Sequence, residues 1–305
     1  MTTPAATRAS VSRSAHVTGI VPPIPTPFLE GRLDLDSLRR LLDELFPTID
    51  GVMVGGSLGE AASLSIAERE TAIRTVADHI GSDRALVVSI ADNSVEHCKR
   101  LSDVAGECGA TLLALSCPNY FPNDLEMLEA YFAELNGIVS ADLCLYDNPY
   151  ATRTPLSIAD IGALQAAAPR ITHVKMTDRT LGKVRQLRDS VDVSVFSGED
   201  SVLWHHLLCG ASGMMASIPM IYPGRVASMW QAFRDGDTDS ANEQYSALSH
   251  FIHCALSAPD YPAVVKAVLH HRDIISSSEM RVPLTALSRD RYDEIISAFK
   301  RLPVN

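Results

Sequence analysis

The sequence lacks the features that mark nucleic-acid-binding and membrane proteins. Its 305 residues carry a net charge of −11, and no cluster of Lys and Arg with interleaved aromatic residues occurs along the chain. Such a charge repels phosphate backbones, so we expect no nucleic-acid partner. No apolar run approaches the roughly 18 residues that a membrane-spanning helix needs, so we expect no membrane association.

Paired cysteine spacing and a secretory signal are also missing. The six cysteines are scattered through apolar segments, which favours buried thiols in a reducing compartment and predicts a cytoplasmic protein. Residues 1–16 are small, hydroxylated and weakly basic, and they lack the apolar stretch of a secretory signal. We predict a disordered N-terminal arm there, and a transit peptide is the alternative.

Eight short apolar runs of strand-like composition alternate with amphipathic helical patterns. The runs cover residues 20–25, 51–55, 85–90, 111–116, 143–146, 172–176, 191–196 and 213–217. Helical patterns between them include 36–45, 65–80 and 94–108, and Ser65 and Ser94 are candidate N-caps of the last two. Eight strands, each followed by a helix, predict an α/β fold, a (β/α)8 TIM barrel, over residues 17–222.

The pattern changes after the eighth predicted strand. Helical patterns near 224–234, 238–256, 260–272 and 287–301 follow without a further strand, which predicts C-terminal helices packed on the barrel over residues 223–305. A doubly wound sheet is the alternative architecture, and it would need a glycine-rich turn after its first strand. Residues 20–30 contain four prolines and no glycine, so the barrel is favoured.

Lysine is scarce, with five in the chain. Lys175 lies in an apolar run at the carboxyl end of the sixth predicted strand, where barrels carry their active sites. The other four lie in helical stretches that we expect to be solvated. Burial disfavours a charged ammonium and leaves a neutral amine that can attack a carbonyl. The alternative is a lysine that pairs with a carboxylate such as Asp147 or Asp178.

Residues that could bind an anion or move a proton lie at two further predicted strand ends. Residues 55–60, Gly-Gly-Ser-Leu-Gly-Glu, follow the second predicted strand, and their glycines let amide groups turn toward an anion while Ser57 adds a hydroxyl. A 2-oxo acid offers a ketone to Lys175 and a carboxylate to this loop. Tyr146 ends the fifth predicted strand, where it could move the protons that Schiff-base chemistry requires. The alternatives are an ordinary tight turn and a rim aromatic.

In order and spacing these residues resemble the dihydrodipicolinate synthase / N-acetylneuraminate lyase family over about residues 17–300. The matching pieces are residues 25–28, the 56–60 loop, Tyr120 within 118–122, Tyr146 with Pro149, Lys175, Ser197 with Gly198, and 213–217. The resemblance implies a class I lyase that forms a Schiff base with pyruvate and makes or breaks the adjacent carbon–carbon bond. It also implies a homotetramer, a dimer of dimers, that uses no metal and no organic cofactor.

The resemblance assigns roles to individual residues. Lys175 would be the Schiff-base lysine, Tyr146 the general acid and base, and Ser57 its partner in proton relay. Tyr120 would reach across a dimer interface to complete the neighbour's site. The expected substrate-binding residues are Gly56, Leu58 (through its amide, with that of Ser57), Arg153, Thr177, Gly198 and Met215.

Departures from the family pattern leave the second substrate open. Leu58 replaces a usual hydroxyl residue, and Ala151 stands where synthases place an arginine, with Arg153 two residues further on. Thr177 resembles the lyase branch, but residues 198–201 lack the full Asp-Glu pair of sialic-acid lyases. A 4-hydroxy-tetrahydrodipicolinate synthase, a dehydratase and a deaminase therefore remain alternatives. A non-catalytic barrel that senses a 2-oxo or amino acid is the alternative from another class.

Overall fold

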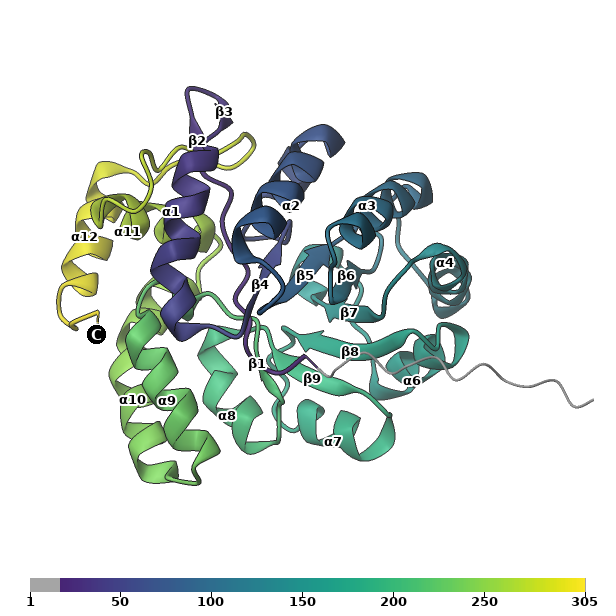
Figure 1. Ribbon diagram of the computed structural model, residues 1–305. Helices are drawn as coiled ribbons and strands as arrows, with labels where there is room; N and C mark the ends of the chain where they lie inside the picture. The colour runs from purple at the N-terminus through teal and green to yellow at the C-terminus, as the bar shows by residue number, and fades with distance from the viewer. Residues whose placement is uncertain (1–16, 305) are drawn as a thin grey trace, which may run out of the picture.

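The fold is built on one parallel sheet that curls into a nearly closed barrel (Figure 1). The computed structural model describes residues 17–304, so the predicted arm at 1–16 lies outside the described residues. The eight strands run in the order β1-β10-β9-β8-β7-β6-β5-β4, and a parallel bridge between Pro23 and Met53 joins the two ends of this sheet. They are β1 (Gly19–Ile20), β4 (Gly51–Val54), β5 (Ala85–Ser89), β6 (Leu112–Ser116), β7 (Leu143–Asp147), β8 (Ile171–Met176), β9 (Ser194–Ser197) and β10 (Gly213–Met214). The predicted (β/α)8 barrel is confirmed.

Helices surround the strands (Figure 1). They are α1 (Leu35–Leu45), α2 (Ile66–Ile80), α3 (Val95–Glu107), α4 (Leu125–Ile138), α5 (Pro149–Thr152), α6 (Ile158–Ala167), α7 (Lys183–Ser190) and α8 (Leu203–Leu208). Short 3-10 turns are η1 (Phe46–Thr48), η2 (Ala61–Ser63), η3 (Asp200–Val202) and η4 (Ile218–Met220). A small antiparallel hairpin, β2 (Phe28–Leu29) with β3 (Arg32–Leu33), was not predicted, because its residues lie outside the eight apolar runs.

Side-chain caps explain where two of the predicted helices begin. The Ser65 side chain accepts a hydrogen bond from the Glu68 amide, and the Glu68 carboxylate accepts one from the Ser65 amide, which completes a capping box at α2. The Ser94 side chain likewise accepts from the His97 amide at the start of α3. Each cap satisfies amide groups that the first helical turn leaves unpaired. Both predicted N-caps are confirmed.

The chain after residue 222 is helical and lies along one flank of the barrel (Figure 1). Its elements are α9 (Pro223–Arg234), α10 (Thr238–Phe251), the π-helical turn η5 (Ile252–Leu256), α11 (Tyr261–His271) and α12 (Arg289–Phe299). The α9 and α10 helices pack against each other, and α11 packs against α12. The segment between α10 and α11 contributes residues to the cavity described below.

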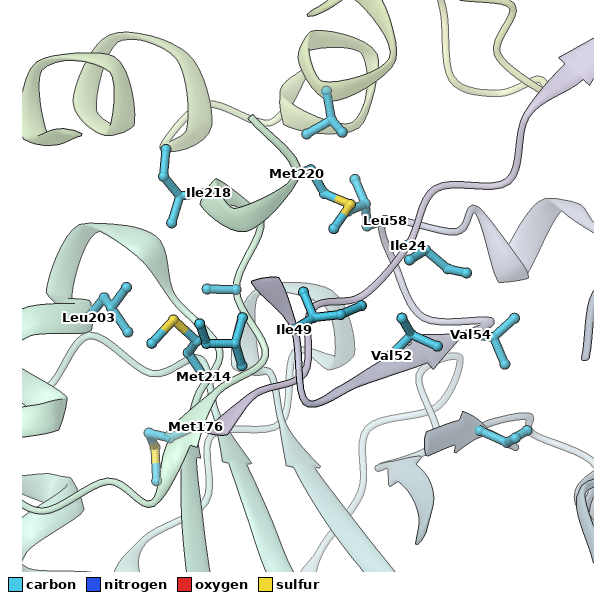
Figure 2. Packing of buried hydrophobic residues seen from close by; sticks show 14 of the residues in the cluster. Ile24, Ile49, Val52, Val54, Leu58, Met176, Leu203, Met214, Ile218 and Met220 are labelled. Atoms are coloured by element: carbon cyan, nitrogen blue, oxygen red, sulfur yellow. The ribbon is translucent and has the colours of Figure 1, made fainter. Parts of the chain in front are cut away.

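Alternation along the strands separates two apolar clusters. Val52 and Val54 belong to the cluster between strands and helices, part of which Figure 2 shows. Met53, which lies between them in β4, belongs to the cluster inside the barrel. Successive strand residues point to opposite faces, and parallel sheets are buried on both. In register, Lys175 pairs with Tyr146 on one side and Phe196 on the other. All three strands therefore bring these side chains to the inside of the barrel.

Candidate active site

Lys175 is a buried amine at the carboxyl end of β8, with 2% of its surface exposed. Its Nζ lies 4.1 Å from the centre of the Tyr146 ring and donates to the Met53 Sδ at 3.7 Å. Within residues 17–304 no carboxylate lies at ion-pair distance from this nitrogen; Asp147, Asp178 and Glu199 pair with other cations.

The carboxylates that could have neutralised Lys175 pair with another lysine. Lys183 Nζ lies 2.7 Å from both Asp147 Oδ2 and Asp178 Oδ2. The alternative in which Lys175 pairs with either of them is therefore wrong. Tyr146 and Asp147 are consecutive, so their side chains leave opposite faces of β7. Tyr146 faces Lys175 inside the barrel, and Asp147 faces Lys183 outside it.

The expectation that the remaining lysines are solvated was wrong for two of them. Lys183 is 6% exposed and Lys266 is fully buried. Lys266 forms an ion pair with Glu60, donates to the Glu279 carbonyl at 2.8 Å, and lies over the Phe28 ring. Both lysines lie on amphipathic helices, and sequence periodicity alone did not show that their helix faces meet buried carboxylates.

Gly198 makes room for the Lys175 side chain. A Cβ at this position would lie 2.9 Å from the lysine Cε and 2.8 Å from the Thr177 Oγ1. Real Cβ atoms do not approach other atoms so closely, and the crowded atoms belong to the buried strand end. A glycine at the end of β9 is therefore required for the lysine to extend along the barrel mouth.

Tyr146 is held so that its phenol can exchange a proton. Asn148 Nδ2 donates to the phenol oxygen at 3.1 Å. Burial alone would raise the pKa of this phenol, but the neighbouring Lys175 and the hydroxyl groups of Ser57 and Thr177 outweigh burial and lower the pKa. A more acidic phenol gives up its proton more readily, as a general acid must.

The Gly55–Glu60 loop after β4 presents free amide groups. Gly55 has φ +77° and Glu60 has φ +55°, so the loop turns sharply at both ends. Across the described residues, the amides of Ser57 and Leu58 meet no hydrogen-bond acceptor. The Leu58 side chain lies in the outer apolar cluster that also holds Ile24 and Met220 (Figure 2), so only its backbone is available to a polar ligand. Successive free amides form an anion-binding concavity.

A cavity of about 500 Å³ opens at this end of the barrel. The predicted site residues that line it are Ser57, Leu58, Tyr146, Arg153, Lys175, Thr177, Gly198 and Met215. Gly56 does not line it; Gly56 lines a second cavity of about 370 Å³, which also borders Ser57 and Tyr146. Tyr120 lines neither cavity in this single chain; its side chain is 80% exposed and packs edge-on against Phe121.

The cavity also holds residues that the sequence did not single out. Asp200 is buried, accepts hydrogen bonds from the amides of Ser217 and Ile218 at 3.0 and 2.8 Å, and burial raises its pKa to about 7. At the outer end, Arg179 Nη2 lies 3.2 Å from Glu199 Oε1. These residues follow β8 and β9, so strand-end position was a usable signal for them.

Tyr261 also lines this cavity. It lies in the C-terminal helices, for which the sequence predicted only a packing role. No sequence pattern near Tyr261 indicated that this residue would line the cavity.

A buried lysine beside a tyrosine at the mouth of a barrel suits the chemistry of the Schiff-base-forming lyases. The family model described as the dihydrodipicolinate synthetase family matches residues 16–302. The chain therefore belongs to this family and is an enzyme, a class I lyase.

Named relatives come from two branches of the family. The N-acetylneuraminate lyase of Citrobacter koseri is 27% identical over 288 residues, which cover 93% of this chain and 96% of the relative. The 4-hydroxy-tetrahydrodipicolinate synthase of Methanococcus maripaludis is 25% identical over 285 residues, 93% of this chain and 98% of its own.

The fold likeness extends to solved structures. A prophage protein of E. coli K12 from the dihydrodipicolinic acid synthase family, solved in complex with pyruvate, matches with a TM-score of 0.89 at 24% identity over 94% of this chain and 99% of its own. Among residues 17–304, no helix has the length and apolar character to cross a membrane.

Proposed function

We propose that the enzyme binds a 2-oxo acid, pyruvate, as a Schiff base on Lys175 and makes or breaks the adjacent carbon–carbon bond. One observation carries this proposal: the buried amine without a carboxylate partner shares a cavity with the free amides of Ser57 and Leu58. The amine suits a ketone and the amides suit a carboxylate, and a 2-oxo acid has both on neighbouring carbons.

The chemistry follows from the groups around the amine. The amine nitrogen of Lys175 attacks the ketone carbon, and the carbinolamine that forms loses its hydroxyl as water after Tyr146 supplies a proton. The resulting protonated imine accepts electrons from the neighbouring carbon. That carbon can then release a proton to give an enamine, or the next bond can break in the lyase direction. Tyr146, at the cavity wall, is placed to donate and accept protons in these steps.

The outer half of the cavity would select the second substrate or the leaving aldehyde. Arg153 and Arg179 line it together with Glu199, so both charge signs are present. Arg153 lines the cavity although it lies two residues beyond the synthase position. The synthase reaction therefore belongs among those to assay, with the lyase, dehydratase and deaminase reactions.

The proposal is tested with a panel of hydroxylated 2-oxo acids, by measuring pyruvate or semialdehyde release. We expect turnover of at least one compound, and none by Lys175→Ala. Tight binding of such compounds without turnover by the wild-type protein would contradict the proposal and favour a sensor of 2-oxo acids.

We also propose a cytoplasmic homotetramer. Tyr120, Phe121, Leu125 and Met127 are all exposed near the start of α4, which is a surface that suits subunit contact. All six cysteines are free, which suits a reducing compartment. Sedimentation of the active enzyme should give a species larger than a monomer, and a fully active monomer would contradict this assignment.

A further inference from the structure

We propose that the buried ion pair between Glu60 and Lys266 positions the two free amides of the loop after β4, so that they receive the substrate carboxylate. This role rests on the proposed function, because the amides of Ser57 and Leu58 are assigned there to the carboxylate of the 2-oxo acid. Lys266 lies on α11, so a helix beyond the barrel would set the geometry of the active site.

Two backbone hydrogen bonds fix the direction of the free amides. The Glu60 amide donates to the Ser57 carbonyl at 3.0 Å, and the Ala61 amide donates to the Gly56 carbonyl. In a planar trans peptide, the carbonyl and the amide that follows it point in opposite directions. The amides of Ser57 and Leu58 therefore point away from residues 60 and 61. The backbone at Glu60 thus decides where the two free amides point.

Glu60 adopts a conformation that its side chain has to hold. Its φ is +55°, in the left-handed region that favours glycine. A residue with a side chain is strained there, and such strain persists where the surrounding structure fixes the backbone. Glycine would relieve the strain but would offer nothing to hold. We infer that the buried carboxylate of Glu60 supplies the contacts that fix this turn.

Three contacts hold the end of the loop from segments far away in the sequence. The Glu60 carboxylate forms an ion pair with Lys266, and its Oε2 accepts a hydrogen bond from the Arg281 amide at 2.8 Å. The Thr26 hydroxyl donates to the Gly59 carbonyl at 2.7 Å. The partners come from the segment after β1, from α11 and from the segment between α11 and α12.

Lys266 is itself fixed in place. Its Nζ donates to the Glu279 carbonyl at 2.8 Å and lies 4.1 Å from the centre of the Phe28 ring. The Glu279 carboxylate in turn accepts from the Gly31 amide at 2.9 Å, which joins the segment after α11 to the β2–β3 hairpin (Figure 1). Burial lowers the pKa of Lys266, and the Glu60 carboxylate opposes this shift. The lysine is therefore held on one side by the hairpin and on the other by the loop.

Stability alone does not explain a charged pair at this place. Removing two ions from water offsets much of their attraction, and apolar residues of similar volume often stabilise a core equally well. Among the described residues that line the two cavities, neither Glu60 nor Lys266 is present. Both are therefore positioning residues that act on the substrate through the loop.

The pair also balances charge beneath an anion-binding loop. The Glu60 carboxylate follows the free Leu58 amide by only two residues. Without its partner, this negative charge would repel the substrate carboxylate, and burial would leave the repulsion poorly screened. Lys266 thus holds the turn and neutralises the carboxylate that forms it.

The proposed role can be tested with pyruvate alone. Exchange of the pyruvate methyl hydrogens for deuterium, followed by proton NMR in D2O, gives a half-saturating pyruvate concentration and a maximal rate. We expect Lys266→Met to raise the half-saturating concentration by about 10–100-fold, because the loop is loosened and carries an unpaired charge. The maximal rate should change by less than about threefold, since the amides bind the carboxylate equally in the ground and transition states.

Lys183→Met is the matched control. Lys183 is also a buried, ion-paired lysine, but its two carboxylate partners lie outside the barrel. Its half-saturating pyruvate concentration should stay within about threefold of wild type, although the fold is destabilised. Both variants are measured at a temperature where they remain folded. An equal rise in the two variants would overturn the proposal, as would a wild-type value in Lys266→Met.

A double variant separates the pair from its two members. Glu60→Gln combined with Lys266→Met leaves no unpaired charge, and glutamine can still accept from the Arg281 amide. The half-saturating concentration should rise by about 3–10-fold, less than in Lys266→Met alone. Single-variant losses that multiply in the double variant would overturn the proposal. If Lys266→Met does not fold, the double variant is compared with Lys183→Met, and an unchanged value would again overturn it.

The failure of this proposal can be told from failure of the proposed function. Borohydride reduction of wild-type enzyme with pyruvate should attach pyruvate covalently to Lys175. If no adduct forms, the proposed function is wrong. If the adduct forms and Lys266→Met keeps the wild-type half-saturating concentration, only the role of the ion pair is wrong.

Discussion

Lys175 and Lys183 are both buried near the carboxyl ends of the barrel strands, yet their surroundings are opposite. Lys183 lies between two carboxylates, each at 2.7 Å, which outweigh burial and raise the pKa of this lysine. Lys175 faces a phenol ring and a thioether. Burial by itself therefore does not mark a reactive lysine. The absence of a carboxylate partner, together with an open cavity, distinguishes Lys175 from its neighbour.

The largest loss of activity is expected when the reactive lysine is replaced. Among the described residues that line the cavity, Lys175 has the only amine, so Lys175→Met should lower activity by at least about 10³-fold. Lys183→Met, measured at a temperature where it remains folded, should keep most of the activity. Steady-state rates of the two purified variants test this. Comparable losses in both would show that the two lysines are not functionally distinct.

For the free energy of unfolding, replacing Lys183 should have a larger effect than replacing Lys175. Lys183→Met leaves Asp147 buried and unpaired, which should lower the free energy of unfolding by about 3–5 kcal/mol. Lys175→Met replaces an unpaired buried amine by an apolar group of similar length, so its effect should stay within about 1 kcal/mol. Denaturant unfolding curves of both variants give these values. A larger destabilisation by Lys175→Met would contradict the contrast.

The third prediction extends the comparison to two buried carboxyl groups. Asp147 has a lysine partner, whereas Asp200 is held by backbone amides and its pKa is raised by burial to about 7. A raised pKa means that the folded state binds the proton more tightly than the unfolded state. The contribution of Asp200 to stability is thus full below about pH 4 and is lost as pH rises toward 7.

Asp200→Asn removes this dependence. Relative to wild type, the variant should gain roughly 2–4 kcal/mol of unfolding free energy between pH 4 and pH 8. Unfolding curves at several pH values measure the difference. A difference that stays flat over this range would show that folding does not raise the pKa of Asp200. Because the comparison is between variant and wild type, other titrating groups such as His206 cancel.

The smallest expected effect concerns the space beside Lys175. Gly198→Ala would place a methyl group 2.9 Å from the lysine Cε, so the lysine or the strand end must shift. We expect destabilisation by about 1–3 kcal/mol and slower adduct formation with pyruvate and borohydride. Gly137→Ala in α4, where an added Cβ meets nothing within 4 Å, is the matched control. Equal adduct rates in the two variants would rule out a steric role for Gly198.

The barrel could be predicted because its signal is repeated. Each strand run and each helix pattern is short, but eight alternations leave few other folds. The capping serines added local confirmation at α2 and α3. The β2–β3 hairpin was missed because its two short strands lie outside the eight apolar runs, whereas the equally short β1 and β10 fall within or beside two of them.

Residues that line the cavity could be predicted where a reactive side chain lies at or just after a strand end. Lys175, Tyr146 and Ser57 stood out for that reason, and the structure places them around one cavity. Burial of Lys183 and Lys266 depends on carboxylates brought from other elements, which periodicity does not report. Tyr261 depends on a bend between two C-terminal helices, and no residue pattern there indicated that the bend reaches the barrel mouth.

Of the five lysines, we expect only Lys175 to be a nucleophile toward a 2-oxo acid. Reduction with borohydride in the presence of pyruvate, followed by peptide mass mapping of every lysine, tests this directly. We expect one pyruvyl adduct per chain, on the peptide that contains Lys175, and none on those of Lys183 and Lys266. An adduct on another lysine, or no adduct at saturating pyruvate, would contradict it.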